Sequence, residues 1–281
     1  MTNVLPLPET ALVTLRCRTN EAQRTDGIID DPMAIRLMES IDYDFSKFKL
    51  STNRQDLALR ALAFDASACS YLTDHPKATV VALGEGLQTS FWRLDAAGLG
   101  SEFRWLTLDL PPIVELRQRL LPHSPRISTC CQSVLDFTWM DMVDPADGVF
   151  ITAEGLLPYL EPDEALRVIR ECAQRFPGGQ MMFDLPPKSQ AVLARQPVWT
   201  ALRGTWPRTP FSLSTSELAD LARTVPGVRA VRNLPLPRGR GPVFDRLMSR
   251  TAGLPIQRPL RRLIGIAFPT IATLTLLEFD S

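Results

Sequence analysis

The chain has 281 residues, of which 45% are hydrophobic and 22% are charged. This length suits one large domain or two small ones, and the composition excludes a generally disordered or collagen-like chain. Thirty-one basic residues balance thirty-one acidic residues, so no net charge attracts nucleic acid or an anionic membrane. The five cysteines form no CxxC pair, which argues against a disulfide scaffold, a zinc ribbon or another metal site of that kind.

No targeting or membrane-spanning pattern is evident. Residues 1–10 lack a basic run followed by an apolar core, so they are not a secretion signal. The longest apolar stretch, residues 263–277, contains Pro269 and is shorter than the roughly twenty residues that span a bilayer. We expect a buried strand there, in a soluble and cytoplasmic protein with no nucleic acid or membrane partner.

The first 75 residues are expected to be helical. A helix should begin at the acidic pair before Pro32, because proline suits a first helical turn. Between Asn53 and Leu72, apolar residues recur at spacings of three and four, which indicates an amphipathic helix. Arg60 lies beside that apolar stripe, so its head group can reach a cleft at the edge of the core.

Strands and helices alternate after residue 77. Short β-branched or apolar runs predict strands at 78–83, 102–108, 127–131, 148–153 and 180–184, and helices are expected at 87–97, after Pro112 and at 161–176. This alternation predicts a parallel sheet with helices on both faces. The carboxyl ends of its strands then share one edge, where ligands bind at the point of strand-order reversal.

The remainder of the chain, residues 186–281, is less regular. A helix is expected at 215–224 and strands at 228–231 and 272–279, together with lid or substrate elements. Three aromatic residues in this region could line a flat acceptor, although ordinary core packing is the alternative; they are Trp199, Trp206 and Phe211.

A glycine turn follows the first predicted strand. Gly84 and Gly86 would let a ligand approach the backbone closely. Asp109 ends the next strand, where an acid can bind both hydroxyls of a ribose. Together they indicate an adenosine-type nucleotide site, the alternative being a bare turn and a solvent-facing acid. Thr89 replaces the third glycine of a dinucleotide motif, and Glu85 would repel a pyrophosphate, which favours S-adenosylmethionine.

Several segments resemble the leucine carboxyl methyltransferase family, and in particular its bacterial polyketide O-methyltransferase branch. The resemblance is carried by VALGEGLQTSFWRL at 81–94, WLTLDLP at 105–111 and AEGLLPYL at 153–160, and it extends to 25–32 and 175–179. It implies a class I S-adenosylmethionine-dependent methyltransferase, with a Rossmann-like doubly wound α/β sheet, N-terminal helices and a C-terminal lid and substrate region. The expected single domain comprises a helical cap (1–75), a nucleotide-binding core (76–185), and a lid with closing strands (186–281).

The resemblance also implies where the adenosyl group binds. Asp109 would hold the ribose, with Leu110 nearby. Ser133 and Val134, followed by Asp136, match the segment that lines the adenine.

The methionine end of the cofactor is assigned in the same way. Gly84 and Gly86 would pass under it, Glu154 would meet its amino group, and Arg60 would pair with its carboxylate, with Arg18 as a second basic residue in that region. A zwitterionic ligand needs one cation and one anion, which agrees with this assignment. The structural alternatives are a helix-surface ion pair for Arg60 and a strand-end cap for Glu154.

The chain departs from the family pattern at four positions. Gln88 and Ser90 stand where an aspartate and an arginine are usual. The loss of an acid together with a base either preserves a balanced pair or modifies the pocket. Thr107 replaces a frequent acid, and Pro158 replaces a frequent methionine.

The expected reaction is methyl transfer to a carboxyl or hydroxyl group of a small-molecule, polyketide-like acceptor. No histidine base lies near the motifs, which favours a carboxyl acceptor or a hydroxyl activated by position alone. We assign no catalytic residue, and the sequence leaves the oligomeric state open. The alternatives are methylation of a protein C-terminal carboxylate, and a non-catalytic nucleotide-binding module or NAD reader.

Overall fold

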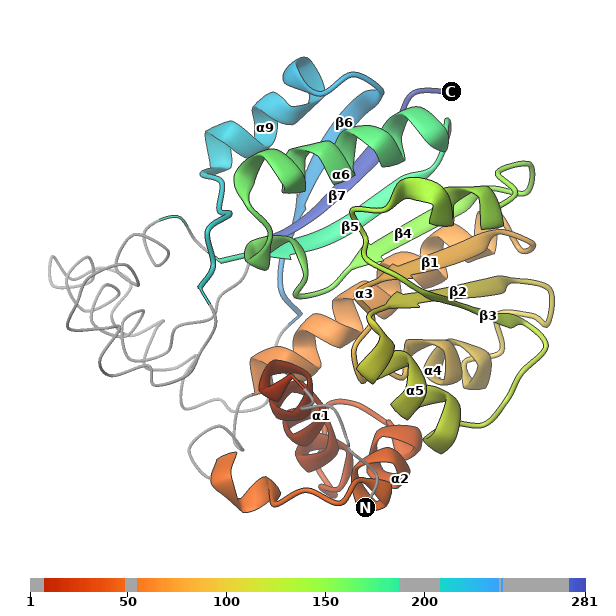
Figure 1. Cartoon of the computed structure of the whole chain (residues 1–281), viewed down its shortest axis with the longest axis vertical. Helices are drawn as coiled ribbons and strands as arrows, with labels where there is room; N and C mark the ends of the chain where they lie inside the picture. The colour runs from red at the N-terminus through yellow and green to blue at the C-terminus, as the bar shows by residue number, and fades with distance from the viewer. Residues whose placement is uncertain (1–7, 49–54, 187, 189–207, 238, 240–272) are drawn as a thin grey trace, which may run out of the picture.

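A seven-stranded sheet of order β3-β2-β1-β4-β5-β7-β6 organises the computed structural model, which describes residues 8–48, 55–186, 188, 208–237, 239 and 273–281 (Figure 1). The strands are β1 (Thr79–Leu83), β2 (Arg104–Asp109), β3 (Ile127–Cys131), β4 (Val149–Ala153), β5 (Gln180–Leu185), β6 (Val228–Leu234) and β7 (Thr273–Phe279). β1 to β5 are parallel, whereas β7 is antiparallel to both β5 and β6. The order reverses between β1 and β4, which confirms the predicted doubly wound sheet.

Helices cover both faces of this sheet. The described α-helices are α1 (Glu9–Ala22), α2 (Pro32–Ser40), α3 (Gln55–Asp74), α4 (Ser90–Ala96), α5 (Pro111–Leu120), α6 (Pro162–Arg175) and α9 (Thr215–Thr224); the described 3₁₀ turns are η1 (Phe45–Phe48), η2 (Phe137–Met142) and η3 (Leu157–Tyr159). In Figure 1, α6 and α9 lie above the sheet, and α3, α4 and α5 lie below it.

The central strand β1 is buried on both of its faces. Val81 and Leu83 belong to the apolar cluster that contains α6 and α9, whereas Val80 and Ala82 belong to the cluster on the side of α3 and α4. All four side chains are at most 2% exposed. A strand covered on both faces has no polar side to present, which explains its uninterrupted apolar sequence.

The helices α1 and α2 pack beside α5 through a separate apolar cluster that includes Leu12, Leu37 and Ile113. α2 begins as predicted, with Pro32 in its first turn and the Asp31 carboxylate accepting a hydrogen bond from the Ala34 amide at 2.9 Å. This arrangement fixes the N-terminal helices next to the segment that leads from β1 into α4.

The helix after β1 begins later than the sequence predicts, at Ser90 instead of residue 87. Arg18 Nη2 donates to the Leu87 carbonyl at 2.6 Å, and Arg117 Nη1 donates to the Gln88 carbonyl at 2.7 Å. These carbonyls would otherwise accept the first helical hydrogen bonds. Arginines from two other helices therefore hold the segment as an extended turn.

The C-terminal part contains α9 as predicted, and β6 extends beyond the expected strand to Leu234. Only residues 273–277 of the long apolar stretch are described, and they form part of β7. Trp199 and Trp206 lie outside the described residues. Phe211 is 2% exposed within the core on the α6 side, which favours its packing alternative over an acceptor-lining role.

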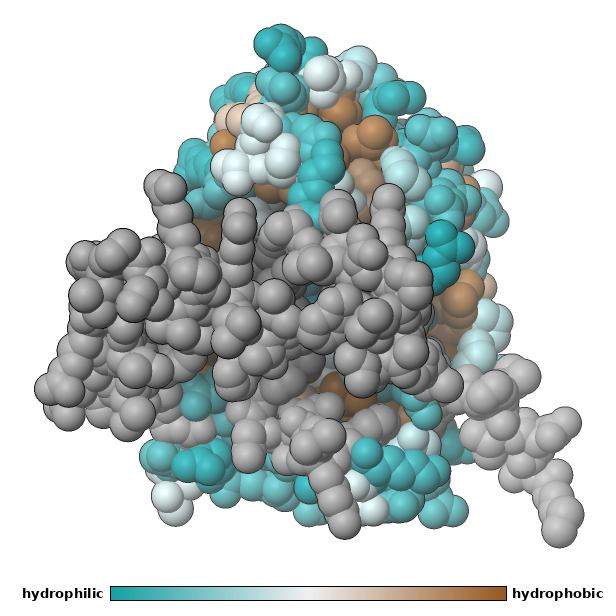
Figure 2. Space-filling view, turned by 90° about the vertical axis from the view of Figure 1, so that its left-hand side faces the viewer, coloured by the Kyte–Doolittle hydropathy of each residue, from teal (hydrophilic) through white to brown (hydrophobic). Residues whose placement is uncertain are grey.

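The described surface in Figure 2 is mostly hydrophilic, with hydrophobic residues scattered among polar ones. In the part of the chain that the structure describes, no helix has the length and apolar character needed to cross a bilayer.

Candidate functional site

The turn after β1 requires glycine at two positions. Gly84 and Gly86 have φ angles of 57° and 59°, a left-handed conformation that side chains disfavour. A Cβ on Gly84 would also lie 2.8 Å from a methyl carbon of Leu156. The predicted glycine turn is therefore present at the carboxyl edge of the sheet, next to the strand-order reversal.

Asp109 lies beside this turn, as the sequence predicts. Its Oδ2 accepts a hydrogen bond from the Gly86 amide at 2.6 Å, and its Oδ1 accepts one from the Leu110 amide at 2.7 Å. Burial raises the pKa of this carboxyl, opposed by the two backbone donors. A carboxylate oxygen can accept two hydrogen bonds, so each oxygen has room for a ligand hydroxyl.

Glu85 does not present its charge to a ligand, which corrects the expectation from the sequence. Its side chain turns inward and is 2% exposed, with Oε1 2.7 Å from Arg117 Nη2. Burial raises the pKa of Glu85, and Arg117 opposes that shift. The argument against a pyrophosphate that rested on Glu85 therefore fails, whereas the argument from Thr89 is unaffected.

Arg60 and Glu154 meet at the ends of α3 and β4. Arg60 Nε donates to Glu154 Oε1 at 3.0 Å, and Arg60 Nη1 donates to Asp184 Oδ2 at 2.9 Å. Although burial opposes its charge, the carboxylates of Asp184 and Glu154 hold the pKa of Arg60 above its usual value. Burial raises the pKa of Glu154, against the effect of Arg60.

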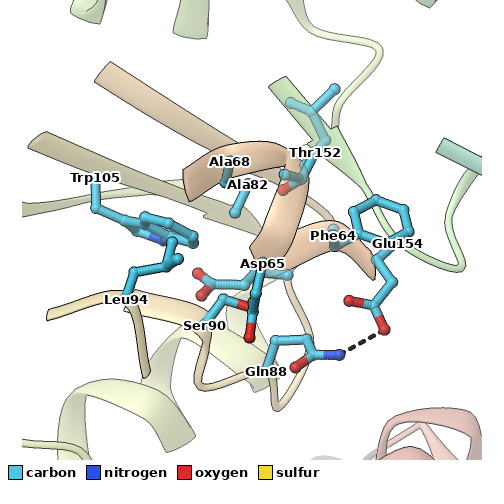
Figure 3. Close-up of a pocket in the computed structure, with 13 residues that line it drawn as sticks. Phe64, Asp65, Ala68, Ala82, Gln88, Ser90, Leu94, Trp105, Thr152 and Glu154 are labelled. Atoms are coloured by element: carbon cyan, nitrogen blue, oxygen red, sulfur yellow. Dashed lines mark hydrogen bonds between the residues drawn. The ribbon is translucent and has the colours of Figure 1, made fainter. Parts of the chain in front are cut away.

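Gln88, one of the departures from the family pattern, also contacts Glu154. Its Nε2 donates to Glu154 Oε1 at 2.6 Å, as the dashed line in Figure 3 shows. Both side chains line a small cavity between α3, α4 and the sheet, together with Asp65 and Trp105. A neutral amide thus orients Glu154 without cancelling its charge. Ser90, a second of the four departures, accepts a hydrogen bond from Arg93 Nη2 at 2.8 Å.

Asp184 belongs with Arg60 and Glu154, and the sequence analysis did not identify it as a candidate site residue. Its Oδ1 accepts the Gly155 amide at 2.5 Å, just as Asp109 accepts the Gly86 amide. Each aspartate ends one strand and binds the glycine after the neighbouring strand. The repeated tetrapeptide Asp-Leu-Pro-Pro at 109–112 and 184–187 was the signal that could have identified it.

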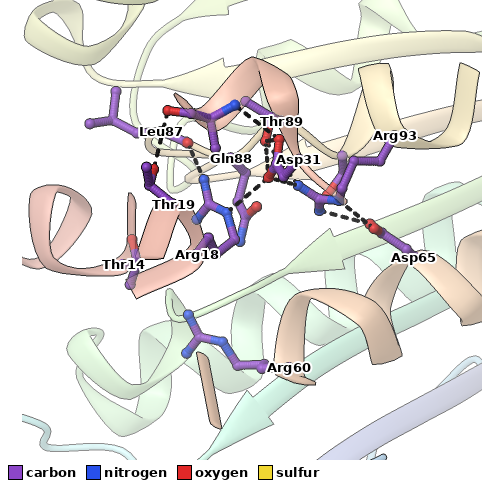
Figure 4. Close-up of polar contacts among 12 residues, drawn as sticks. Thr14, Arg18, Thr19, Asp31, Arg60, Asp65, Leu87, Gln88, Thr89 and Arg93 are labelled. Carbon is purple, nitrogen blue, oxygen red and sulfur yellow. Dashed lines mark hydrogen bonds and ion pairs between the residues drawn. The ribbon is translucent and has the colours of Figure 1, made fainter. Parts of the chain in front are cut away.

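A series of buried ion pairs links Arg18 to Asp65, which lines the same cavity as Glu154 (Figure 4). Asp31 Oδ2 lies 3.4 Å from Arg18 Nε and 2.6 Å from Arg93 Nη1, and Arg93 Nε donates to Asp65 at 2.6 Å. Against the effect of burial, Arg93 and Arg18 hold the pKa of Asp31 below its usual value. Burial lowers the pKa of Arg18, while the carboxylates of Asp31 and Glu154 oppose that shift.

Arg18 retains one donor that no described residue accepts. Its side chain is fully buried, and its Nη1 has no hydrogen-bond partner among the described residues. A buried donor of this kind costs free energy unless something accepts its hydrogen bond. Arg18 therefore fits an anionic ligand group arriving between α1 and the turn after β1.

The segment after β3 forms the far end of the same edge. Val134 is 8% exposed, and its carbonyl accepts the Trp139 indole at 3.3 Å. Ser133 Oγ accepts the Leu135 amide at 3.2 Å, and the Asp136 carboxylate caps η2. Since β3 pairs with β2 up to the register partners Asp109 and Cys131, this turn follows directly beside Asp109.

The predicted residues thus form three neighbouring groups along one edge. These are the glycine turn with Asp109, the cluster of Arg60 and Glu154 with Arg18 nearby, and the turn after β3. The described residues contain no group of three or more His, Cys, Asp or Glu side chains that could hold a metal ion.

The sheet order and this edge define a class I S-adenosylmethionine-dependent methyltransferase fold. The solved structure of the plantazolicin methyltransferase BamL shares it, with a TM-score of 0.51, 11% identity, and 97% of each chain covered.

The chain belongs to the leucine carboxyl methyltransferase family, whose model matches residues 11–173. It is 32% identical over 177 residues to the tetracenomycin polyketide synthesis O-methyltransferase TcmP of Streptomyces glaucescens. The matched residues cover 63% of this chain and 64% of TcmP. It is 25% identical over 240 residues to the S-adenosyl-L-methionine-dependent methyltransferase dpfgK of Gibberella zeae, covering 79% of each chain. The match therefore spans less than two thirds of the length of TcmP.

Proposed function

We propose that this protein is an S-adenosylmethionine-dependent O-methyltransferase that methylates a small, polyketide-like acceptor, most readily at a carboxylate. The observation that carries the proposal is the pairing of Arg60 with Glu154 at the strand-order reversal, one strand away from the glycine turn and two strands away from Asp109. S-adenosylmethionine has a zwitterionic amino-acid group at one end and a ribose in its adenosyl group. The pair of Arg60 and Glu154 suits the zwitterion, and Asp109 suits the ribose. The family membership and the names of the relatives support the same reading.

The adenosyl end is assigned to the glycine turn and the two strand ends beside it. The free acceptor sites of Asp109 would receive the ribose hydroxyls, and the exposed Leu110 would cover one face of the sugar or base. Ser133 and Val134 would line the adenine. Gly84 and Gly86 would keep the turn in the left-handed conformation that passes its backbone under the ligand.

The amino-acid end is assigned to the charged cluster. Arg60 and the unpaired Nη1 of Arg18 would receive the carboxylate, and Glu154 would receive the ammonium. The hydrogen bonds from Arg60 and Gln88 both reach Oε1 of Glu154, so Oε2 is the oxygen available to a ligand. Charge-assisted hydrogen bonds at a buried site are the strongest kind that a protein can offer here.

When bound, S-adenosylmethionine supplies an electrophilic methyl group. The chain contributes alignment of that group with the acceptor and exclusion of water. Neither histidine lies at the site: His75 stacks on Tyr71 beside Gly148, before the start of β4, and His123 precedes the start of β3. Both are at the opposite edge of the sheet. A carboxylate acceptor, already anionic at neutral pH, needs no such base.

We also propose which part of the single domain binds the cofactor and which part binds the acceptor. The core at 76–185 would hold the cofactor, and the acceptor would bind between the helical cap at 1–75 and the C-terminal part at 186–281. The buried contacts from Arg18 to Leu87 and from Asp31 to Thr89 support a cap that is firmly attached to the core.

The test is transfer of a radiolabelled methyl group from S-adenosylmethionine to a panel of aromatic carboxylic acids, phenols and carboxyl-terminal peptides. Mild alkali then separates the products, because a methyl ester releases labelled methanol and a methyl ether does not. Base-labile label on a small acid supports the proposal. Label only on phenols would contradict the carboxylate preference, label only on peptides would support the protein-directed alternative, and tight NAD binding without S-adenosylhomocysteine binding would overturn the methyltransferase assignment.

A further inference from the structure

We propose that Asp184 is a positioning residue that holds the Arg60 guanidinium against the backbone of Gly155, so that Arg60 can exchange Glu154 for the carboxylate of the cofactor. This inference rests on the proposed function. It concerns a residue outside the motifs that carry the family resemblance, at the end of β5.

The contacts of Asp184 join two elements that must stay in register. Its Oδ2 accepts Arg60 Nη1 at 2.9 Å, and its Oδ1 accepts the Gly155 amide at 2.5 Å. The residue is 4% exposed. The Asp184 carboxylate thereby links the Arg60 side chain of α3 to the turn that carries Glu154.

Gly155 supplies the surface on which the guanidinium rests. Its φ angle is 66°, and a Cβ built on it would lie 3.3 Å from Arg60 Nη1 and 3.4 Å from Nη2. A Cβ at these distances would fit only if the guanidinium shifted by a few tenths of an ångström. Arg60 is therefore confined by backbone on one side and by the Asp184 carboxylate at one nitrogen.

This confinement resolves a difficulty in the cluster. Arg60 and Glu154 bind each other at 3.0 Å, yet the proposed function needs them to bind opposite ends of one zwitterion. Were Glu154 the sole anchor, Arg60 would lose its position when Glu154 turned to the ammonium. Asp184 keeps a second anchor in place, and Gln88 at 2.6 Å keeps Glu154 at its own position. Both partners are thus pre-organised for the exchange.

The test compares two ligands in Asp184→Asn by calorimetry. S-adenosylhomocysteine has the amino-acid end, whereas 5′-methylthioadenosine lacks it. An asparagine oxygen can still accept the Gly155 amide, but its NH₂ group then faces the Arg60 donors. We expect about a tenfold or larger loss of affinity for S-adenosylhomocysteine and less than about a twofold change for 5′-methylthioadenosine.

Glu278→Gln is the matched control, because Glu278 is a 7% exposed carboxylate on β7 that pairs with Arg229 and faces Gln180 at the opposite end of β5. It should change neither affinity. Equal loss of both ligands in Asp184→Asn, or unchanged binding of both, would overturn the inference. Wild-type protein that fails to bind S-adenosylhomocysteine would instead overturn the proposed function.

A second variant keeps the inference testable if Asp184→Asn does not fold. Gly155→Ala places a methyl group against the guanidinium and strains a backbone whose φ angle is 66°, while leaving every charge in place. It should reproduce the selective loss of S-adenosylhomocysteine binding, and unaltered selectivity between the two ligands in a folded Gly155→Ala protein would overturn the role given to Arg60 confinement.

Discussion

Asp109 shows how a single side chain at this edge is prepared for a ligand. Two backbone amides, of Gly86 and Leu110, fix its carboxylate at 2.6 and 2.7 Å, so little conformational entropy remains to be lost on binding. The same backbone contacts also mean that the carboxylate supports the turn as well as the proposed ribose.

Replacing Asp109 with alanine should weaken S-adenosylhomocysteine binding about ten- to a hundredfold, which corresponds to about 1.4 kcal/mol for each factor of ten. Titration calorimetry measures this loss. Asp95→Ala is the control, since Asp95 pairs with Arg126 on the outer side of α4 and is 45% exposed at its side chain. Unchanged affinity in folded Asp109→Ala would refute the ribose role.

The raised pKa of Glu154 predicts how binding depends on pH. Burial favours the neutral form of this carboxyl, so it becomes protonated at a higher pH than an ordinary glutamate with a pKa of about 4.3. Protonation removes the partner of the ligand ammonium. Affinity for S-adenosylhomocysteine should therefore fall on acidification while most exposed carboxylates are still ionised.

The control for this pH dependence is Glu154→Gln, which cannot titrate. Its affinity should be lower than that of the wild type at neutral pH, and its pH profile should be flatter. Because burial also raises the pKa of Asp109, the profile of Asp109→Asn separates the two contributions. A wild-type profile that Glu154→Gln leaves unaltered would contradict the ammonium role.

At the scale of the elements, the buried ion network attaches the N-terminal helices to the core. Asp31 precedes α2, accepts the Thr89 hydroxyl at 2.7 Å ahead of α4, and pairs with Arg18 of α1 and Arg93 of α4. Removal of one partner leaves buried charges uncompensated, which is the costly way to break such a network.

Asp31→Asn should accordingly lower the free energy of unfolding by about 3–5 kcal/mol, measured by urea denaturation at pH 7. Asp26→Asn is its matched control, because the Asp26 side chain is 57% exposed in its pair with Arg24, and a surface pair contributes only about 0–1 kcal/mol. Similar stability losses in the two variants would contradict the network account.

The sign of the pH effect follows from the lowered pKa of Asp31. Its stabilising contribution is present above the unfolded-state pKa of about 3.9 and is lost as the pH falls toward the lower folded-state value. The stability advantage of wild type over Asp31→Asn should therefore shrink below about pH 4. An advantage that stayed constant down to acid unfolding would contradict this assignment.

At the scale of the whole molecule, the parallel core followed from local patterns, whereas the closing strands did not. Alternating apolar runs and glycine or proline boundaries predicted β1 to β5 within a few residues. Nothing local specifies that β7 inserts between β5 and β6, because strand pairing across long separations depends on tertiary packing.

The position of the candidate residues in the fold was predictable where family motifs and strand ends coincide, as at Asp109 and Glu154, and where a helical stripe located a side chain, as at Arg60 on α3. It was not predictable where a charged side chain pairs with a residue that only the folded structure brings close. The sequence gives no indication that Glu85 turns inward to Arg117, or that arginines from α1 and α5 occupy the carbonyls that would start α4 earlier. Such contacts join residues that are distant in sequence and carry no shared spacing.

A crystal structure of the protein with S-adenosylhomocysteine is the most direct test. The account predicts ribose hydroxyls within hydrogen-bond distance of Asp109, adenine beside Val134, the carboxylate on Arg60 and the ammonium on Glu154. A ligand bound elsewhere, or bound at this edge with its amino-acid end away from the Arg60 and Glu154 pair, would contradict it.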